Sequence, residues 1–199
     1  MQLYCATKNP GKLREFIEIA GGVQVLPGLD AIPAPEETGN TFEQNAADKA
    51  TYYSRFCGGL LFVDDSGIEV DALGGAPGVY SARFAGPSAT DEANNRLLLE
   101  RMSGESNRRA RYVCVVALAR RGELLESFRG EVEGELLEAP HGSNGFGYDP
   151  LFYYPPFGRT FGEVSAEEKK QVSHRGRALR RMREYLDRSE WRSNSEATI

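Results

Sequence analysis

Long hydrophobic runs, cysteine and histidine are all scarce in this sequence of 199 residues. No apolar run approaches the roughly 20 residues that a helix needs to cross a bilayer, so we expect no membrane partner. The first residues, MQLYCATKNPGK, lack the charged region, apolar stretch and cleavage site of a signal peptide. The three cysteines are far apart and odd in number, which predicts buried, reduced thiols and a cytoplasmic protein. No CxxC motif or Cys/His cluster suggests zinc.

An excess of positive charge is also missing, because the formal net charge is -5. This argues against a stable nucleic-acid partner, since such proteins are more often basic. Lys and Arg do gather between Lys169 and Arg192, where a solvated helix face is the simplest interpretation. The length and the 40% hydrophobic content favour a single globular domain over residues 1–187, followed by a polar tail over 188–199.

Apolar periodicity predicts alternating strands and helices. Strands are expected at 2–6, 23–26, 60–63 and 151–156, and helices at 10–20, 42–57, 90–102 and from 166 onward, where Ser165 and Glu168 would form a capping box. A long hairpin is expected at 110–136, with a turn near Arg121-Gly122 and alternating apolar and polar residues along its second arm. Asn9, Thr41, Thr90 and Ser165 are the expected N-caps. This mixture of strand–helix units and a hairpin predicts an α/β protein with a mixed sheet.

Two adjacent carboxylates, Asp64 and Asp65, follow the apolar run LLFV. They repel each other, so they either lie in water at a loop tip or are held by something cationic. Ligands of open α/β sheets bind beyond the carboxyl ends of strands, and Mg²⁺ commonly takes one or two carboxylates plus substrate phosphates. Glu36 and Glu37 offer further carboxylates in a nearby Pro/Gly-rich loop.

The segment TKNPGK places a polar turn between a strand and a helix. A helix N-terminus can bind an anion, with Lys12 adding a charge and Thr7 and Asn9 adding hydrogen bonds. The alternative is that Asn9 is only an N-cap and Lys12 a solvated lysine.

Two later segments add an aromatic loop and a His-Arg pair. GSNGFGYDPLF has glycines that let backbone approach a ligand, and Phe146 and Tyr148 would offer a flat face to a base, unless both rings pack inward. SHRGRAL places His174 beside Arg175, for which a surface position on a basic helix is the alternative. Together these segments contain the groups needed to bind and cut a nucleoside triphosphate.

With these residues identified, the sequence resembles the Ham1 family, the inosine triphosphate pyrophosphatases that hydrolyse non-canonical purine nucleotides. The resemblance runs from about Leu3 to Leu186. It rests on TKNPGK, EETGNTFEQNAADKA, VDDSGIEVDALGGAPGVYSARFAG, GFGYDP and EEKKQVSHRGRAL, in that order and spacing. One departure is Gln44, where the family often has glutamate.

The resemblance implies an elongated mixed β-sheet with flanking helices, two lobes around a central cleft, and usually a homodimer. It implies Asp65 as the catalytic residue, with Asp64 and either Glu36 or Glu37 helping it to hold Mg²⁺. The residues it implies for phosphate binding are Thr7, Lys8, Asn9, Lys12, Lys49 and Lys169. Ser66 would touch the substrate, and the implied base pocket consists of Phe146, Gly147, Tyr148, Asp149, His174 and Arg175.

The expected reaction is hydrolysis of ITP, dITP or XTP to the nucleoside monophosphate and pyrophosphate. Water would attack the α-phosphorus, and Asp65 would either accept its proton or orient it on the metal. A Maf-like nucleotide pyrophosphatase is one alternative, and a non-catalytic binder of nucleotides or nucleic acid is another.

Overall fold

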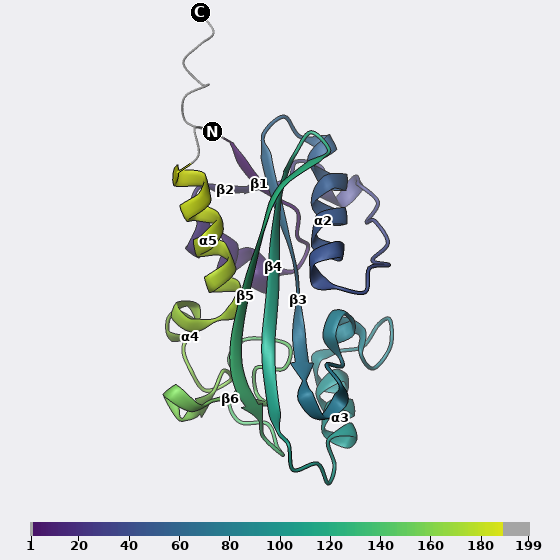
Figure 1. Ribbon diagram of the computed structural model, residues 1–199, viewed down its shortest axis with the longest axis vertical. Helices are drawn as coiled ribbons and strands as arrows, with labels where there is room; N and C mark the ends of the chain where they lie inside the picture. The colour runs from purple at the N-terminus through teal and green to yellow at the C-terminus, as the bar shows by residue number, and fades with distance from the viewer. Residues whose placement is uncertain (1, 189–199) are drawn as a thin grey trace, which may run out of the picture. The chain divides into compact units, whose positions relative to one another are not determined.

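The computed structural model describes residues 2–188, and its strands form one sheet in the order β2-β1-β3-β4-β5-β6-β7 (Figure 1). The strands are β1 (Leu3–Cys5), β2 (Val23–Val25), β3 (Leu60–Val70), β4 (Arg109–Arg120), β5 (Glu123–Leu136), β6 (Phe152–Tyr154) and β7 (Arg159–Thr160). β1 is parallel to β2 and β3, whereas β6 is antiparallel to β5 and β7. The predicted mixed sheet is therefore confirmed.

Five α-helices accompany the sheet in the described chain. They are α1 (Pro10–Ala20), α2 (Phe42–Tyr53), α3 (Asp91–Arg101), α4 (Ala166–Val172) and α5 (His174–Arg188). Short 3-10 helices cover Leu29–Ala31, Ser54–Phe56, Asp71–Leu73, Gly78–Arg83 and Pro155–Phe157. The first helix serves as the crossover that two parallel strands require, since it joins β1 to β2. Within residues 2–188, no helix is both long and apolar enough to span a membrane.

The long hairpin forms as predicted, with a turn at Arg121 and Gly122. Their φ angles of 54° and 86° match the twist that a two-residue hairpin turn needs. Along β5, Phe128, Val132 and Leu136 are buried while the residues between them are mostly exposed or half-buried. This alternation is that of a half-buried antiparallel strand.

The chain divides into two compact units, each with its own core. Unit 1 contains residues 1–65, 115–129 and 175–199, and unit 2 contains residues 66–114 and 130–174. In unit 1, Phe16 of α1 packs edge-on against Phe62 of β3 with ring centroids 5.0 Å apart. In unit 2, Leu98 and Met102 join a buried cluster with Ile68 and Phe152. The predicted cleft between two lobes stays a prediction.

Several predicted elements end earlier in the structure, among them the helix predicted over 42–57, whose α-helical part stops at Tyr53. Two differences are larger. β3 does not end before the carboxylates but continues to Val70. The last helix is split, because Ser173 adopts extended backbone between α4 and α5. The predicted capping box of Ser165 and Glu168 is present and starts α4. The predicted polar tail lies outside the described residues except for Arg188, the last residue of α5.

The three cysteines are free thiols, as predicted. Cys5 and Cys114 are buried and Cys57 is half-buried. Burial raises the pKa of the Cys5 thiol to about 12, so this thiol is unreactive at neutral pH.

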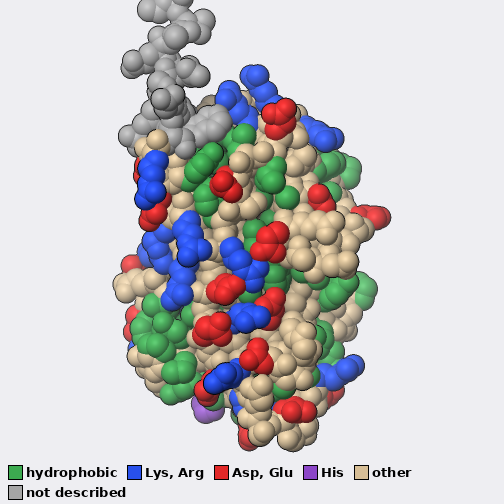
Figure 2. Space-filling model, in the orientation of Figure 1, with side chains coloured by type: hydrophobic (Ala, Val, Ile, Leu, Met, Phe, Trp, Pro, Cys, Tyr) green, Lys and Arg blue, Asp and Glu red, His purple; other side chains and the backbone are tan. Residues whose placement is uncertain are grey.

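Basic side chains gather on the surface over α5 (Figure 2). Arg177 and Arg181 are exposed there, which confirms the predicted solvated face for these positions. Lys169 and Arg175 are exceptions, because both are buried. The interpretation of His174 and Arg175 as surface residues is wrong for the same reason.

Candidate active site

The two adjacent carboxylates lie inside β3, and both are buried. Only 5% of Asp64 and 6% of Asp65 is exposed, so the solvated loop tip is wrong and the cationic alternative is confirmed. Successive side chains of a strand point to opposite faces. The two carboxylates therefore meet different partners, with α2 on one side of β3 and α5 on the other (Figure 1).

Asp64 is held by two cations from helices far apart in the sequence. Lys12 Nζ of α1 lies 2.9 Å from its Oδ1, and Arg175 Nε of α5 lies 3.2 Å from its Oδ2. Arg175 also donates from Nη1 to Glu15 at 2.6 Å. A buried carboxylate between two cations is an ionised group.

Asp65 meets α2 on the other face of the strand. Lys49 Nζ donates to Asp65 Oδ1 at 2.9 Å and to Glu37 Oε1 at 2.8 Å. Asn45 Nδ2 donates to Asp65 Oδ2 at 3.2 Å, while its own Oδ1 accepts from the backbone of Gly39. Lys49 thus brings two carboxylates to one cation, and Asn45 ties the Glu36–Glu37 loop to the same site.

The surroundings move the pKa values of the two carboxylates in opposite directions. Burial would raise the pKa of Asp64, but the charges of Lys12, Arg175 and Lys49 outweigh it and hold that pKa well below its usual range. Burial raises the pKa of Asp65, and Lys49 offsets this only in part. Burial would also lower the pKa of Lys49, but Asp65 and Glu37 reverse that effect and raise it. Two neighbouring acids with separated pKa values are typical of acid–base sites.

Glu37 and Asp65 form a donor set that suits Mg²⁺. Both supply hard carboxylate oxygens, and both lie against the ammonium group of Lys49. Glu36, the other candidate in this loop, is exposed. Within residues 2–188, no three His, Cys, Asp or Glu side chains gather closely enough to hold a metal by themselves. Mg²⁺ commonly takes one or two protein carboxylates and completes its shell with water and substrate phosphates, so the residues present fit it.

The TKNPGK segment caps α1 as predicted. Asn9 Oδ1 accepts from the N–H groups of Gly11 and Lys12 at 2.8 and 3.1 Å, and Thr7 Oγ1 accepts from the N–H of Asn9. These backbone donors are already used, so an anion here would meet side chains. Lys12 faces Asp64, while Lys8 is half-exposed and lies 4.0 Å from Asp30.

In unit 2, the aromatic loop is built around the buried carboxylate of Asp149. Asp149 Oδ2 accepts from the N–H of Phe146 at 2.9 Å and from Lys169 Nζ at 2.6 Å. Oδ1 accepts from the Tyr112 hydroxyl at 3.2 Å. Gly145 has a φ of +77°, and a Cβ there would lie 2.0 Å from Asp149 Oδ2, so only glycine fits this approach.

The two aromatic rings of this loop differ in exposure. Tyr148 is only 4% exposed and its hydroxyl donates to the carbonyl of Ser81 at 2.7 Å, so the inward alternative holds for this ring. Phe146 is half-buried, and the Lys169 ammonium lies 4.9 Å from its ring centroid. Phe146 is therefore the ring of this pair that remains suited to stacking on a base.

The other predicted residues fall into one unit or the other. His174 belongs to unit 2 and stacks on Tyr112, with centroids 4.7 Å apart and planes within 8°. Arg175 belongs to unit 1, where it pairs with Asp64 and Glu15. Lys169 joins the aromatic loop of unit 2. Ser66 is half-buried within β3.

Comparison with known proteins decides the family. The model of the Ham1 family matches residues 3–185. The chain belongs to the Ham1 family. A dITP/XTP pyrophosphatase of Exiguobacterium sp. is 54% identical over 187 residues, covering 92% of this chain and 95% of its own. One from Acidobacterium capsulatum is 52% identical, covering 90% of this chain and 95% of its own.

Solved Ham1 structures share the fold. The Staphylococcus aureus Ham1 protein superposes with a TM-score of 0.85 at 38% identity, covering 94% of this chain and 98% of its own. A Ham1 protein from Coxiella burnetii gives a TM-score of 0.86 at 38% identity, covering 95% of this chain and all of its own. The fold predicted from the Ham1 resemblance is thus confirmed for its mixed sheet and flanking helices.

The sequence analysis missed three residues that contact the predicted Ham1 site residues. Tyr112 joins Asp149 to His174 but lies in an unremarkable apolar strand. Glu15 lies on a helix face where an exposed glutamate is ordinary. Asn45 could have been found, because it directly follows Gln44 in the family-like segment and a buried asparagine needs partners.

Proposed function

We propose that this protein hydrolyses non-canonical purine nucleoside triphosphates, such as ITP, dITP and XTP, to the monophosphate and pyrophosphate. The observation that carries the proposal is the buried pair of Asp64 and Asp65, with pKa values displaced in opposite directions. The relatives named dITP/XTP pyrophosphatases, at about half of all positions identical, supply the substrate class.

Asp65 acts as the general base. In the metal-free protein, burial raises the pKa of Asp65, which makes it a better proton acceptor than an ordinary aspartate. Lys49 and Asn45 fix both of its oxygens. Asp65 takes a proton from the attacking water as the oxygen bonds to the α-phosphorus. The bond between the α-phosphorus and the oxygen that bridges it to the β-phosphate then breaks, and that oxygen leaves with pyrophosphate.

Asp64 has a different task in this scheme. It stays ionised and holds Lys12 and Arg175 in place. Lys12 and Lys49 then offer positive charge to the triphosphate, which carries several negative charges. The half-exposed Lys8 adds to this attraction.

Glu37 and Asp65 would hold Mg²⁺, with Asp64 and Glu36 as the further carboxylates of the same region. The metal would supply charge neutralisation for the leaving pyrophosphate. The protein's own part is to keep the Glu37 loop in place, which it does through Lys49 and Asn45.

In unit 2, Phe146 would stack on the base, with Gly147, Asp149 and His174 as its neighbours in the pocket and Tyr148 packed inward as their support. Ser66 and Arg175 are proposed as further substrate contacts. At position 6, the bases of ITP and XTP carry a carbonyl oxygen that accepts a hydrogen bond, whereas adenine carries an amino group that donates one. A pocket that presents donors to position 6 would leave them unpaired with ATP and would therefore reject it. Stacking on Phe146 would contribute roughly 1–3 kcal/mol to any purine. Phosphate contacts by Lys169 and Thr7 remain part of the proposal, as do a homodimer and a cytoplasmic location.

One assay tests the function: pyrophosphate release from ITP, dITP, XTP, ATP, GTP and pyrimidine triphosphates, with Mg²⁺ and with EDTA. We expect kcat/KM for the first three to exceed that for ATP and GTP by at least about a hundredfold, and activity only with the metal. Comparable rates on ATP and ITP would refute the substrate class. Preference for pyrimidines would favour a Maf-like enzyme, and nucleotide binding without cleavage would favour a binding protein.

A further inference from the structure

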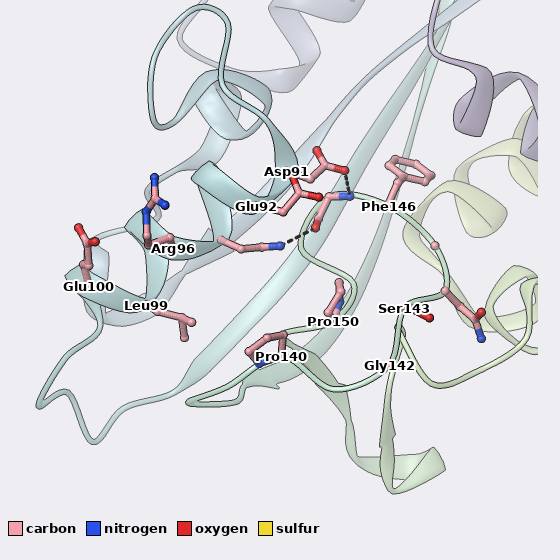
Figure 3. A pocket seen from close by; sticks show the side chains of 14 residues that line it. Asp91, Glu92, Arg96, Leu99, Glu100, Pro140, Gly142, Ser143, Phe146 and Pro150 are labelled. Carbon is pink, nitrogen blue, oxygen red and sulfur yellow. Dashed lines mark hydrogen bonds between the residues drawn. The ribbon is translucent and has the colours of Figure 1, made fainter.

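Both backbone polar groups of Gly147, in the aromatic loop, are hydrogen-bonded to α3. The N–H of Gly147 donates to Asp91 Oδ2 at 2.6 Å, and the carbonyl of Gly147 accepts from Asn95 Nδ2 at 3.0 Å (Figure 3). Asp91 and Asn95 are four residues apart and so lie one above the other on the same helix face. Both polar groups of Gly147 are therefore committed to one neighbouring helix.

The helix that makes these two bonds is itself firmly fixed. Thr90 caps it by accepting from the N–H of Ala93. Asn94 is 3% exposed and bonds to the backbone of Ala82 and Ala85, and Leu98 lies in the core of unit 2. α3 is thus a rigid support for the loop.

The loop needs such support because a cavity of about 570 Å³ lies against it. α3 contributes Asn95, Arg96 and Leu99 to the wall, and the loop contributes residues 142–147 (Figure 3). Asn144 anchors the start of the loop to Gly162 and Val164, and Asp149 anchors its end. Between these anchors the chain borders open space rather than packed side chains, so hydrogen bonds must fix it.

An acidic residue in the first turn, such as Asp91, favours a helix in general, whereas the stability of α3 does not explain Asn95. Thr90 already supplies the cap, and Asp91 is exposed. Asn95 Oδ1 is buried without a hydrogen-bond partner among residues 2–188, which is unfavourable, and asparagine is a poor helix former. An asparagine that is unfavourable for its own helix but bonds to a loop indicates a role in that loop.

We infer that Asp91 and Asn95 are positioning residues that fix the Gly147 peptide, and with it the ring of Phe146, for binding the purine base. The inference rests on the proposed function, in which this loop receives the base. Gly147 has a φ of +65°, a conformation that other residues rarely adopt. The two bonds hold this flexible residue in one orientation before the nucleotide arrives, so that binding does not have to order the loop.

The test uses the full chain and substitutions at three positions of α3. Asp91→Ala removes the acceptor for the Gly147 N–H, and Asp91→Asn keeps an acceptor oxygen there. Glu92→Ala is the matched control, because it removes a carboxylate from the same first turn and the same cavity wall. Hydrogen exchange of the Gly147 amide reports the clamp, and the Kd for the non-hydrolysable α,β-imido analogue of ITP reports base binding.

We expect Asp91→Ala to speed exchange of the Gly147 amide and to weaken binding of the analogue by about tenfold, the scale of one charged hydrogen bond. Asp91→Asn should restore most of both, and Glu92→Ala should change each by less than about twofold. Asn95→Ala introduces a strong helix former and should weaken binding similarly, so it tests the inference if Asp91→Ala lowers Tm.

Unchanged exchange in Asp91→Ala would overturn the inference, and so would faster exchange with an unchanged Kd in both Asp91→Ala and Asn95→Ala. Equal losses in Glu92→Ala would also overturn it, because they would trace the effect to the helix. A parent protein that binds the analogue but cleaves no ITP would refute the proposed function alone. A parent that does not bind the analogue would refute both.

Discussion

Replacing Asp65 by asparagine should stop turnover while leaving the protein at least as stable as the parent. Asparagine keeps the shape of the side chain, and its one carbonyl oxygen can still accept from Lys49, but it cannot take a proton. Loss of a general base costs about 10²–10⁴ in rate, so kcat for ITP should fall by at least about a hundredfold.

The stability half of this prediction follows from the direction of the pKa shift. Because burial raises the folded-state pKa of Asp65, ionised Asp65 at neutral pH is less favourable in the folded chain than in the unfolded one. A neutral amide avoids that cost, so the Tm of Asp65→Asn should equal or exceed that of the parent.

The adjacent Asp64→Asn variant is the matched control, with the opposite expectation. Its carboxylate is 2% exposed in the side chain and lies between Lys12 and Arg175. Removing one partner of a buried pair costs about 3–5 kcal/mol, and each kcal/mol lowers Tm by about 2–4 °C in a chain of this length. Asp64→Asn should therefore lower Tm by roughly 6–20 °C.

Thermal denaturation of the metal-free variants at pH 7, and pyrophosphate release at saturating Mg²⁺, decide the matter. The reasoning is refuted if Asp65→Asn loses as much stability as Asp64→Asn. Near-normal turnover in Asp65→Asn would refute the assignment of the base.

Three further predictions concern the neighbours of this pair. Lys12→Ala should raise KM for ITP by about tenfold or more through loss of one charged contact, and steady-state rates with unchanged KM and kcat would place Lys12 outside the site. Arg175→Ala should reduce kcat/KM for ITP more than for ATP if Arg175 reads the base; an equal loss on both substrates would show that it acts only by holding Asp64. The folded-state pKa of Asp64 lies below its unfolded value of about 3.9, so its contribution to stability is present above about pH 3.9 and is lost as the pH falls through the folded-state pKa. In acid titrations, the Tm of the metal-free parent should therefore fall more steeply than that of Asp64→Asn. Parallel curves would contradict this.

Local signals in the sequence were enough for most of the fold. Caps at Asn9, Thr41 and Thr90, the alternation along β5 and the Arg121–Gly122 turn are short-range features, and each forms as predicted. The break at Ser173 was missed, because serine is tolerated inside helices and the apolar spacing carries on into α5.

The site was predictable as a set of residues but not as a set of contacts. Asp64 and Asp65 suggested the end of a strand because charge is costly to bury. β3 continues through them because Lys12 and Arg175 neutralise the buried charge of Asp64. These two residues lie 52 and 111 residues away along the chain, and pattern analysis does not report such pairings. For the same reason, the sequence did not show that Asp149 neutralises Lys169 or that Glu37, rather than Glu36, approaches Lys49.

The placement of the carboxylate pair also bears on how β3 finds its place in the sheet. Leu60 to Val63 are buried on both faces, so apolar alternation gives this strand no preferred alignment beside β1. A slip of one residue would bring Val63 or Ser66 to a position where a lysine now meets a carboxylate, and it would leave a buried cation without its counter-ion. The charges that make the site reactive therefore also select the register of β3. A chain that folds with β3 in another register would be both unstable and inactive.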